Sequence, residues 1–365
     1  MAEPKLSSPA QVPARIGYRM PAEWEPHEAT WIAWPHNAQD WPGRFTPIPW
    51  VYAEIVRQLH LDEKVRILVK DRELEEKAKS LLKKAGVALG RVEFFRVPTD
   101  RVWTRDSGPI FVVKDGAQGK RSLALTDWRF NAWAKYNNWK QDDNVPDAIN
   151  RSLKLPAWKP VAGARKQRMV LEGGSIDVNG RGLLLTTEEC LLSEVQQRNP
   201  GLTKAEIETG LCDYLGIKKV LWLENGIVGD DTHGHVDDLA RFTDPNTIVI
   251  ASEKDKSDLN YDLLRENLRR LKSMRNLAGK PFRVVSLPMP APVVFDGQRL
   301  PASYANFYIS TGSVLVPTFN DPNDRVALAC LQKLFPKHRV VGIHCLELVW
   351  GLGTLHCMTQ QQPLG

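Results

Sequence analysis

The fold is decided by the stretch Trp350-Gly351-Leu352-Gly353-Thr354-Leu355-His356-Cys357-Met358-Thr359-Gln360, which completes a pattern that begins far upstream. An apolar run over residues 339–343 leads into this polar, glycine-bearing stretch. Four earlier apolar runs lead into polar segments in the same order. Internal recurrence of this kind predicts similar structural units placed one after another along the chain.

The four earlier units share one order of elements. Their apolar runs and the polar segments that follow are residues 92–97 before Trp103-Thr104-Arg105-Asp106-Ser107-Gly108, residues 169–171 before Glu172-Gly173-Gly174, residues 220–223 before His233-Gly234-His235, and residues 282–287 before Ser303-Tyr304-Ala305-Asn306. Each unit then continues into a strand, a turn and a second strand. The turns are marked by Asp115-Gly116, Asn179-Gly180, Asp244-Pro245 and Thr311-Gly312.

The fifth unit, which contains Cys357, has no second strand before the sequence ends. We expect the N-terminal run over residues 30–34 to supply that strand and to close a ring. A ring would bring all five polar segments to one end of its axis, so that distant residues share one pocket. The competing interpretation is the alternation of strands and helices found in any α/β protein, and the pattern alone leaves both open.

The rest of the pattern predicts one α/β domain over residues 17–365, preceded by a disordered tail over residues 1–16. Apolar residues at helical spacing predict helices over residues 49–61, 71–84, 186–198, 203–215, 257–277 and 324–335. Short β-rich runs predict strands over residues 65–69, 92–97, 220–223, 282–287 and 339–343.

Bulk properties narrow the class of protein. The chain has 365 residues, of which 42% are hydrophobic and 25% charged, as in ordinary globular domains. No apolar run approaches the roughly 18 residues of a membrane span, and no secretory signal is visible. Five widely spaced cysteines indicate reduced thiols and a cytoplasmic setting. The net charge of +6 is spread along the chain, which argues against a nucleic-acid partner.

The local charge near the third polar segment has the opposite sign. Residues 224–238 hold five acidic residues and no lysine or arginine. An acidic pocket in a basic chain indicates a small cationic ligand held at short range.

Cys357 differs from the other cysteines in its surroundings. Cys190, Cys212 and Cys330 lie on apolar helix faces, where a cysteine is an inert small hydrophobic residue. Polar residues and glycines surround Cys357 instead, which suits an accessible nucleophile. In an extended strand His356 would point to the opposite face, so a proton-handling partner for Cys357 is expected from elsewhere in the chain.

The run His233-Gly234-His235-Val236-Asp237-Asp238 is the candidate for that partner. In a strand, His233, His235 and Asp237 would share one face. One interpretation is a metal-dependent hydrolase that uses these three residues as ligands. The other is acid–base chemistry, in which His235 moves protons while Asp237 orients a cationic substrate. Asp106 beside Arg105 and Glu172 beside two glycines are weak signals when each is taken alone.

Taken together, these residues resemble the agmatine deiminase family, which is related to the peptidylarginine deiminases within the guanidine-modifying penteins. The resemblance runs from Met20 to Pro363. Its specific parts are Trp103-x-x-Asp106, Glu172-Gly173-Gly174, His235-Val236-Asp237 and His356-Cys357-x-Thr359-Gln360-Gln361. It implies a five-bladed, pseudo-symmetric α/β propeller with its site on the axis, which favours the ring.

The resemblance also implies roles for individual residues. Cys357 would be the nucleophile and His235 the general acid and base, while Asp106 and Asp237 would bind the guanidinium. Glu172 would be a further polar residue of the substrate site, and Trp103 and Gly353 would contact the substrate. The family commonly has Gly-Gly-Gly-Asn-Ile-His-Cys before the nucleophile, whereas this chain has Leu352 and Thr354 within that motif. These departures concern the pocket for the substrate tail.

The expected reaction is the hydrolysis of agmatine to N-carbamoylputrescine and ammonia, a step of putrescine and polyamine biosynthesis. It would pass through an amidino-cysteine intermediate, with no metal and no organic cofactor. Free arginine and peptidylarginine are alternative substrates, although no obvious arginine pair is present to hold a carboxylate. Amidino transfer and simple binding of cationic amines remain further alternatives, and the family resemblance implies a homodimer.

Overall fold

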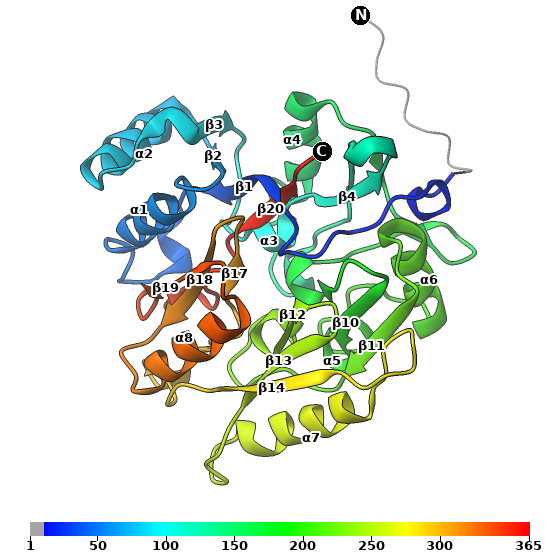
Figure 1. The fold of residues 1–365 in the computed structure, drawn as a ribbon. Helices are drawn as coiled ribbons and strands as arrows, with labels where there is room; N and C mark the ends of the chain where they lie inside the picture. Colours follow the sequence, from blue (N-terminus) through cyan, green and yellow to red (C-terminus); the bar gives the residue numbers. More distant parts are fainter. Residues whose placement is uncertain (1–10) are drawn as a thin grey trace, which may run out of the picture.

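The computed structural model describes residues 11–365, and its strands lie inside a shell of helices (Figure 1). The fold is α/β, with small mixed sheets in place of one large sheet. The first ten residues of the predicted tail lie outside the described residues. Among residues 11–365, no helix combines the length and the apolar character needed to cross a membrane.

Four three-stranded sheets repeat one pairing pattern. In each, the middle strand pairs antiparallel with the strand before it in the chain and parallel with the strand after it. The sheets are β4 (Ile110–Asp115), β5 (Arg121–Thr126) and β6 (Ala157–Trp158); β9 (Asp177–Val178), β10 (Leu183–Thr187) and β11 (Lys219–Leu223); β12 (Ala240–Asp244), β13 (Thr247–Ser252) and β14 (Arg283–Pro288); and β17 (Tyr308–Ile309), β18 (Ser313–Thr318) and β19 (Arg339–His344). All four predicted turns connect the antiparallel pairs.

A four-stranded sheet joins the two ends of the described chain. It contains β20 (Gln360–Pro363), β1 (His27–Ala33), β2 (Lys64–Val69) and β3 (Val92–Arg96) in that order. Strand β20 pairs antiparallel with β1, with Thr30 opposite Gln361, and β1 pairs parallel with β2. The red strand β20 and the blue strand β1 therefore lie side by side in Figure 1. The prediction that residues near the N-terminus supply the strand missing after Cys357 is confirmed.

Most predicted helices are present with small changes in their bounds. The helices of eight or more residues are α1 (Ile48–Leu59), α2 (Arg72–Lys84), α4 (Val145–Leu153), α6 (Lys204–Leu215), α7 (Asn260–Ser273) and α8 (Asn323–Leu334). Asp71 caps α2 through Leu74 N, and Thr203 and Glu206 form a capping box at α6, which explains where both helices begin. Helix α4 was not predicted. Shorter elements include α3 (Thr104–Ser107) and two small hairpins, β7–β8 (Val161–Ala162 and Gln167–Arg168) and β15–β16 (Val294–Phe295 and Gln298–Arg299).

The prediction of a helix over residues 186–198 is wrong for most of its length. Thr186 and Thr187 belong to β10, and only α5 (Glu188–Leu192) is helical. Beyond it the chain turns inward, because Arg198 forms buried hydrogen bonds with Glu172 and with the carbonyl oxygen of Thr232. These polar contacts decide the path of the segment where apolar spacing predicted a helix.

Part of the predicted N-terminal tail is also structured. Residues Pro13–Ile16 form the 3-10 helix η1, and Val12 and Ile16 pack against a buried cluster that includes Trp158. The indole nitrogen of Trp158 donates a hydrogen bond to the carbonyl oxygen of Gln11 at 3.0 Å. Burial of these apolar side chains explains why the segment is ordered.

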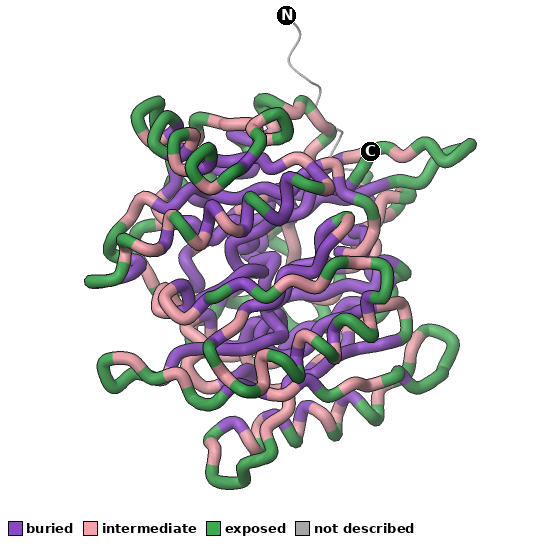
Figure 2. The backbone as a smooth tube through the Cα atoms, turned by 60° about the vertical axis from the view of Figure 1, so that its left-hand side comes forward, coloured by how far each residue is buried: buried purple, intermediate pink, exposed green. Residues whose placement is uncertain are grey.

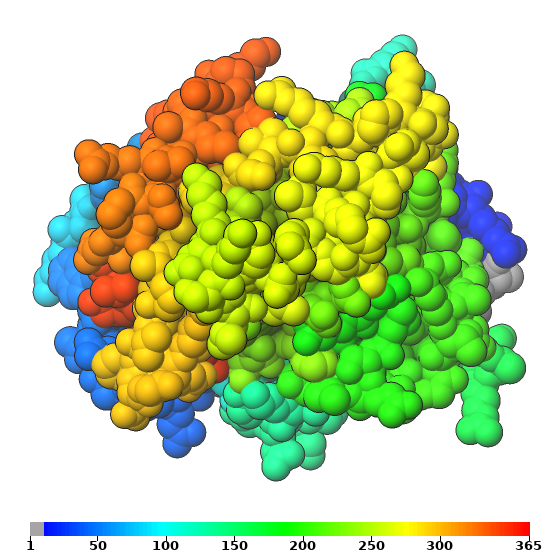
Figure 3. All heavy atoms as spheres, turned by 90° about the horizontal axis from the view of Figure 1, so that it is seen from below, coloured from blue at the N-terminus to red at the C-terminus, as the bar shows by residue number. Residues whose placement is uncertain are grey.

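The core follows the sheets. Figure 2 shows buried backbone through the middle of the molecule and exposed backbone mainly at its periphery. Viewed from below in Figure 3, the yellow-green and yellow segments, which include α7, cover the centre of that face. The interior side chains form three clusters, of which the largest joins the C-terminal residues around Leu355 and Met358 to α1 and β2. The segment with Cys357 is therefore held from several sides.

Candidate active site

Side chains from five separate segments meet at one place in the molecule. Each segment leads directly into the antiparallel strand of its own sheet, so the repeated topology carries all of them to the same end of the sheets. In chain order they hold Asp106 in α3, Glu172 before η7 (Gly173–Ser175), His235 and Asp237 at η8 (Val236–Asp238), Asn306 before β17, and Cys357 before β20.

Cys357 is almost enclosed, with 5% of its surface exposed, and its sulfur has polar neighbours. The side-chain Nδ2 of Asn306 donates a hydrogen bond to Sγ at 3.0 Å, and Sγ lies 3.7 Å from Asp237 Oδ2. Burial, and then the charges of Asp237, Asp238 and Asp106, raise the pKa of the Cys357 thiol well above its ordinary value. The sulfur is therefore a neutral thiol at pH 7 unless a cation joins it.

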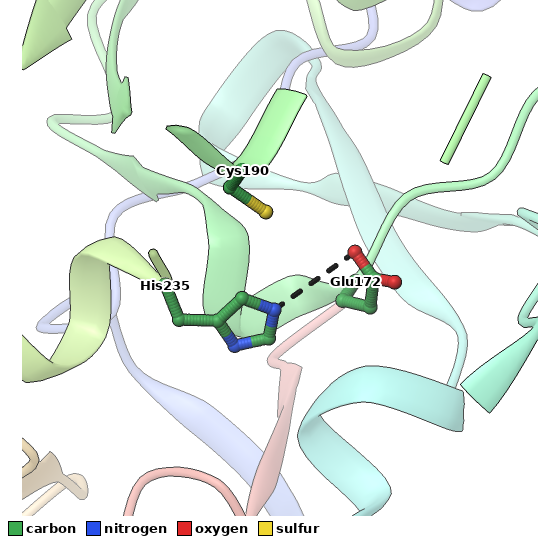
Figure 4. A group of neighbouring side chains, drawn as sticks. All are labelled: Glu172, Cys190 and His235. Atoms are coloured by element: carbon green, nitrogen blue, oxygen red, sulfur yellow. Dashed lines mark ion pairs between the residues drawn. The ribbon is translucent and has the colours of Figure 1, made fainter. Parts of the chain in front are cut away.

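His235 is fully buried among three carboxylates, as Figure 4 shows for one of them. Its Nδ1 lies 3.9 Å from Asp106 Oδ1 and 3.9 Å from Asp237 Oδ1, while its Nε2 lies 3.9 Å from Glu172 Oε2. Burial opposes protonation, but Asp106, Cys190 and Glu172 together raise the pKa of His235 well above its ordinary value. Neither ring nitrogen has a hydrogen-bond partner among the described residues, so both can exchange protons with a bound molecule.

Asp237 is oriented by a second histidine. His356 Nδ1 lies 2.7 Å from Asp237 Oδ2, and His356 Nε2 lies 2.8 Å from Glu23 Oε2. Burial alone would raise the pKa of Asp237, yet His356 and then His235 lower it below its ordinary value. Oδ1 of Asp237 is left without a partner among the described residues. Asp237 is thus an ionised acceptor. His356 holds Asp237 in place through its hydrogen bond and favours the ionised form of its carboxyl group.

Asp106 faces the same space from α3. Its Oδ2 accepts a hydrogen bond from Trp133 Nε1 at 3.0 Å, and its Oδ1 accepts one from Gly174 N at 3.1 Å. Burial raises the pKa of Asp106 to about 7. The neighbouring arginine does not pair with it.

Arg105 points instead toward the C-terminal strand. Its Nη1 donates to Gln360 Oε1 at 2.8 Å and to Gln361 Oε1 at 2.6 Å. Arg105 therefore does not form an ion pair with Asp106, although the two residues are adjacent in the sequence. Arg105 ties α3 to β20 and so fixes Asp106 relative to Cys357.

Glu172 is held by a buried arginine. Arg198 Nε donates to Glu172 Oε1 at 2.9 Å, and Oε2 lacks a partner among the described residues. Burial alone would raise the pKa of Glu172, but Arg198 and His235 lower it to about 2. Glu172 is therefore ionised and faces His235.

One group of side chains has the composition of a metal site. Glu172, Cys190 and His235 each offer a ligand atom, and these atoms lie within 4.8 Å of one another (Figure 4). A thiolate, an imidazole and a carboxylate are ligands that suit zinc. The group is not the trio that the sequence indicated, because it contains neither His233 nor Asp237.

The run around His235 is not a strand. His233 and Gly234 have φ values of +62° and +92°, and the backbone N–H groups of Gly234 and His235 both donate to Asp230 Oδ2. The ring of His233 turns away to Ser193 Oγ, at 3.1 Å from Nε2. The prediction that His233, His235 and Asp237 share a strand face is therefore wrong. His235 and Asp237 meet through a loop and a 3-10 turn, and His233 is outside the site.

A pocket with a cavity volume of about 210 Å³ leads to Cys357 and Asp106. Trp103 and Gly353 both line it. A Cβ atom added at Gly353 would lie 2.8 Å from the Trp103 ring and 3.2 Å from Cys357 Cβ, so only glycine fits there without displacement. Leu352 also lines the pocket, with a left-handed φ of +69° at a position where the family motif has glycine.

Charged side chains line the outer wall of the pocket, and of these only Asp231 belongs to the acidic run that the sequence indicated. Asp40, Arg101, Tyr136 and Asp231 line it. Arg101 Nη1 donates to Asp40 Oδ1 at 2.9 Å, and the guanidinium of Arg101 lies 4.2 Å from the centre of the Tyr136 ring. The sequence indicated no arginine pair for a carboxylate, and the structure places a single arginine, Arg101, in this wall.

Other contributors were missed because their signals are non-local. Trp133, Glu23 and Arg198 act on the predicted residues through hydrogen bonds across the fold, and so does His356, which the sequence showed only as a motif residue beside Cys357. Asn306 was visible in the sequence only as part of the fourth polar segment. The recurrence itself was the signal that could have placed Asn306 beside Cys357.

Comparison with known proteins identifies the family of the chain. The model of the Porphyromonas-type peptidyl-arginine deiminases matches residues 19–363. The chain belongs to this family. An agmatine deiminase of Pseudomonas aeruginosa (strain LESB58) is 36% identical over 381 residues, covering 98% of this chain and 99% of the relative.

Solved structures of family members are similar throughout. An agmatine deiminase of Enterococcus faecalis, described as catalysing its reaction, superposes with a TM-score of 0.87 at 32% identity and covers 97% of this chain and 98% of the other. A cysteine-to-serine variant of the C. jejuni agmatine deiminase with substrate bound gives a TM-score of 0.83 at 32% identity, covering 95% and 97%.

Proposed function

We propose that the protein is an agmatine deiminase, a hydrolase that converts agmatine and water to N-carbamoylputrescine and ammonia. The observation that carries the proposal is the meeting of the Cys357 thiol, the His235 imidazole and the Asp106 and Asp237 carboxylates beside a narrow pocket. The family to which the chain belongs, and the agmatine deiminases similar to it along its whole length, support the same reaction.

Asp106 and Asp237 bind the guanidinium group. Asp237 Oδ1 is buried without a donor among the described residues, and Asp106 is buried beside it. A planar guanidinium supplies several N–H donors in a fixed arrangement, and each charge-assisted hydrogen bond contributes about 1.5–3 kcal/mol. The two carboxylates therefore fix the plane of the substrate and its distance from the sulfur.

The Cys357 thiol gives up its proton to solvent, its sulfur attacks the central carbon of the guanidinium, and a bond forms between sulfur and carbon. His235 gives its proton to one nitrogen, the bond between that nitrogen and the carbon breaks, and ammonia leaves. The cysteine then carries an amidino group. Water, which gives a proton to His235, attacks the same carbon, the carbon–sulfur bond breaks, and the thiol and the ureido product are released. Glu172 stabilises the protonated form of His235 throughout.

The bound cation also activates the nucleophile. Because burial and three carboxylates raise the pKa of Cys357, the thiolate is disfavoured before substrate arrives. A guanidinium between Asp106 and Asp237 cancels part of this negative charge and lowers the pKa of the thiol. The substrate thereby promotes formation of the thiolate that attacks it.

The proposal also covers the arrangement of the repeated units, the extent of the domain, the cellular location and the oligomeric state. The five repeated units, with β20 and β1 in one sheet, form a five-bladed pseudo-symmetric propeller around the site. Residues 17–365 form one catalytic domain. The enzyme acts in the cytoplasm, in putrescine and polyamine biosynthesis, as a homodimer whose mass in solution light scattering can measure.

Agmatine is the favoured substrate because the pocket is small and reaches the buried carboxylate of Asp106. A cavity of about 210 Å³ suits a small molecule better than an arginine within a protein chain. Free arginine is the closer competitor, since Arg101 in the outer wall is a cation that its carboxylate can approach.

The deciding experiment offers agmatine, free arginine and an arginine-containing peptide to the purified protein. Ammonia and ureido product are measured, with iodoacetamide or a chelator in parallel samples. Turnover of agmatine that iodoacetamide abolishes and a chelator spares supports the proposal. Loss of activity with the chelator would instead favour a metal-dependent hydrolase built on Glu172, Cys190 and His235. An added amine that appears in the product would identify an amidinotransferase.

A further inference from the structure

Asp40 in the outer wall of the pocket has one carboxylate oxygen without a partner. Asp40 ends the short 3-10 helix η2 (Ala38–Asp40), and only 2% of its side chain is exposed. Oδ1 accepts a hydrogen bond from Arg101 Nη1 at 2.9 Å, whereas Oδ2 has no donor among the described residues. A buried carboxylate oxygen without a donor is costly, and it indicates that a ligand supplies one.

The other acidic residue of this wall is already satisfied. Lys135 Nζ donates to Asp231 Oδ1, and the hydroxyl of Tyr136 donates to Asp231 Oδ2 at 2.7 Å. Of the Asp40 and Asp231 carboxylate oxygens in this wall, only Asp40 Oδ2 therefore lacks a donor among the described residues. Because burial raises the pKa of Asp40 to about 6, against the opposing effects of Arg101 and His36, its carboxyl group is ionised at pH 7.5.

We propose that Asp40 binds the distal ammonium group of the substrate, so that the site selects guanidines with a positively charged tail. This inference rests on the proposed function and adds the residue that reads the far end of the substrate. The wall beside it includes Trp103 and Leu352, whose apolar surfaces suit the methylene chain that joins the two cationic ends.

The charges around Asp40 favour an ammonium over the other tails. A methyl group would leave Oδ2 buried without a donor, and a carboxylate would approach it as a like charge. Arg101 could meet a carboxylate through Nε, which is also without a partner among the described residues. Its charge is, however, already paired with Asp40 at 2.9 Å.

Measuring the affinity of a ligand for protein that lacks the nucleophile tests recognition of the substrate tail independently of the reaction. We suggest calorimetry on Cys357→Ser protein with agmatine and with pentylguanidine, in which a methyl group replaces the ammonium. A charge-assisted hydrogen bond predicts that agmatine binds about 10- to 100-fold more tightly. Asp40→Asn should remove most of this preference by weakening agmatine alone, while pentylguanidine changes by less than about threefold.

Asp231→Asn in the same background is the matched control, because Asp231 lines the same pocket with both oxygens already bonded. It should leave the ratio of the two affinities unchanged. Asp40→Glu provides a second test if Asp40→Asn fails to fold. Its carboxylate extends one methylene further, so it should shift the preference toward 3-aminopropylguanidine, whose chain is one methylene shorter than that of agmatine.

Three outcomes overturn the inference, and the first two concern the relative affinities of the two ligands. Equal weakening of both ligands by Asp40→Asn would make Asp40 a structural partner of Arg101, and loss of the preference in Asp231→Asn would assign the ammonium to Asp231. Turnover is a separate readout. If the protein with Cys357 intact hydrolyses no guanidine, but the tighter binding of agmatine than of pentylguanidine depends on Asp40, the proposed function fails and the tail site stands. If agmatine is hydrolysed but its affinity ignores Asp40, the tail site alone fails.

Discussion

Asn306 donates a hydrogen bond from Nδ2 to the sulfur of Cys357 at 3.0 Å, and the same nitrogen donates to Asp238 Oδ1 at 2.9 Å. Its Oδ1 accepts from Thr354 Oγ1 and from His356 N, so the amide is fixed from both sides. An N–H donor stabilises a thiolate more than a thiol. Asn306 thus opposes the effect of the carboxylates on the sulfur, together with a backbone hydrogen bond from Thr354 that lowers the pKa of the thiol.

Replacing Asn306 by Asp should therefore slow the enzyme. Asp keeps the acceptor oxygen but puts a negative charge where the donor stood. Loss of a hydrogen bond to a charged group costs about 1.5–3 kcal/mol, which predicts a fall in kcat/KM of about 10- to 100-fold. Thr354→Val, which removes only the hydroxyl bonded to Asn306 Oδ1, is the milder control. An unchanged rate in Asn306→Asp would show that the contact with sulfur has no catalytic effect.

The reactivity of Cys357 should depend on a bound cation. Burial and the carboxylates raise the pKa of the thiol, so iodoacetamide should modify the free enzyme slowly at pH 7 and faster as pH rises. Acetamidinium should shift this profile to lower pH by neutralising the carboxylates. Acetamide, which has similar size and no charge, controls for steric blocking. Rapid modification of the free enzyme at neutral pH would contradict the expectation.

The pH dependence should show an acidic limb. Burial raises the pKa of Asp106 to about 7, so below that pH the carboxyl group is protonated and cannot accept the guanidinium as an anion. kcat/KM should therefore fall as pH drops through about 7. The limb in kcat should lie at lower pH, because the bound cation favours the ionised form. An acidic limb in kcat/KM centred below pH 5 would be inconsistent with this environment.

Gly174→Ala should damage the site itself. A Cβ atom at this position would lie 2.6 Å from His235 Nδ1, 2.8 Å from Asp106 Oδ1 and 3.0 Å from Asp237 Oδ2. Overpacking of this kind costs about 1–3 kcal/mol, and here it displaces three groups of the site. We expect kcat/KM to fall at least about 100-fold. Gly90→Ala, where nothing lies within 4 Å of the added atom, should leave both activity and thermal stability unchanged.

The sequence predicted the sheets better than the loops. Alternating apolar runs with turn signals such as Asn179-Gly180 mark local hairpins, and the recurrence led to the pairing of β1 with β20. The helix expected over residues 186–198 failed because Arg198 is drawn inward by Glu172, which lies 26 residues earlier in the chain. Apolar spacing carries no information about such a contact.

For the site, too, the sequence identified some residues and could not identify others. The motif residues around Cys357 and His235 could be identified because they stand out from packing residues in the sequence. The reason given for His235 and Asp237 was wrong, since a strand was expected where His233 and Gly234 have left-handed φ values. Trp133 and Glu23 carry no local signal, because their roles exist only once the segments meet.

Because β20 pairs with β1, the position of the Cys357 thiol depends on contacts between the two ends of the described chain. His27 and Pro363 stand opposite each other although they lie at opposite ends of the described chain, and Cys357 is placed by the strand that this closure holds. Such a long loop closes late in folding, because its entropy is lost before the contacts form. A chain whose first strand has detached therefore carries a misplaced sulfur, and enzyme activity becomes a measure of complete folding.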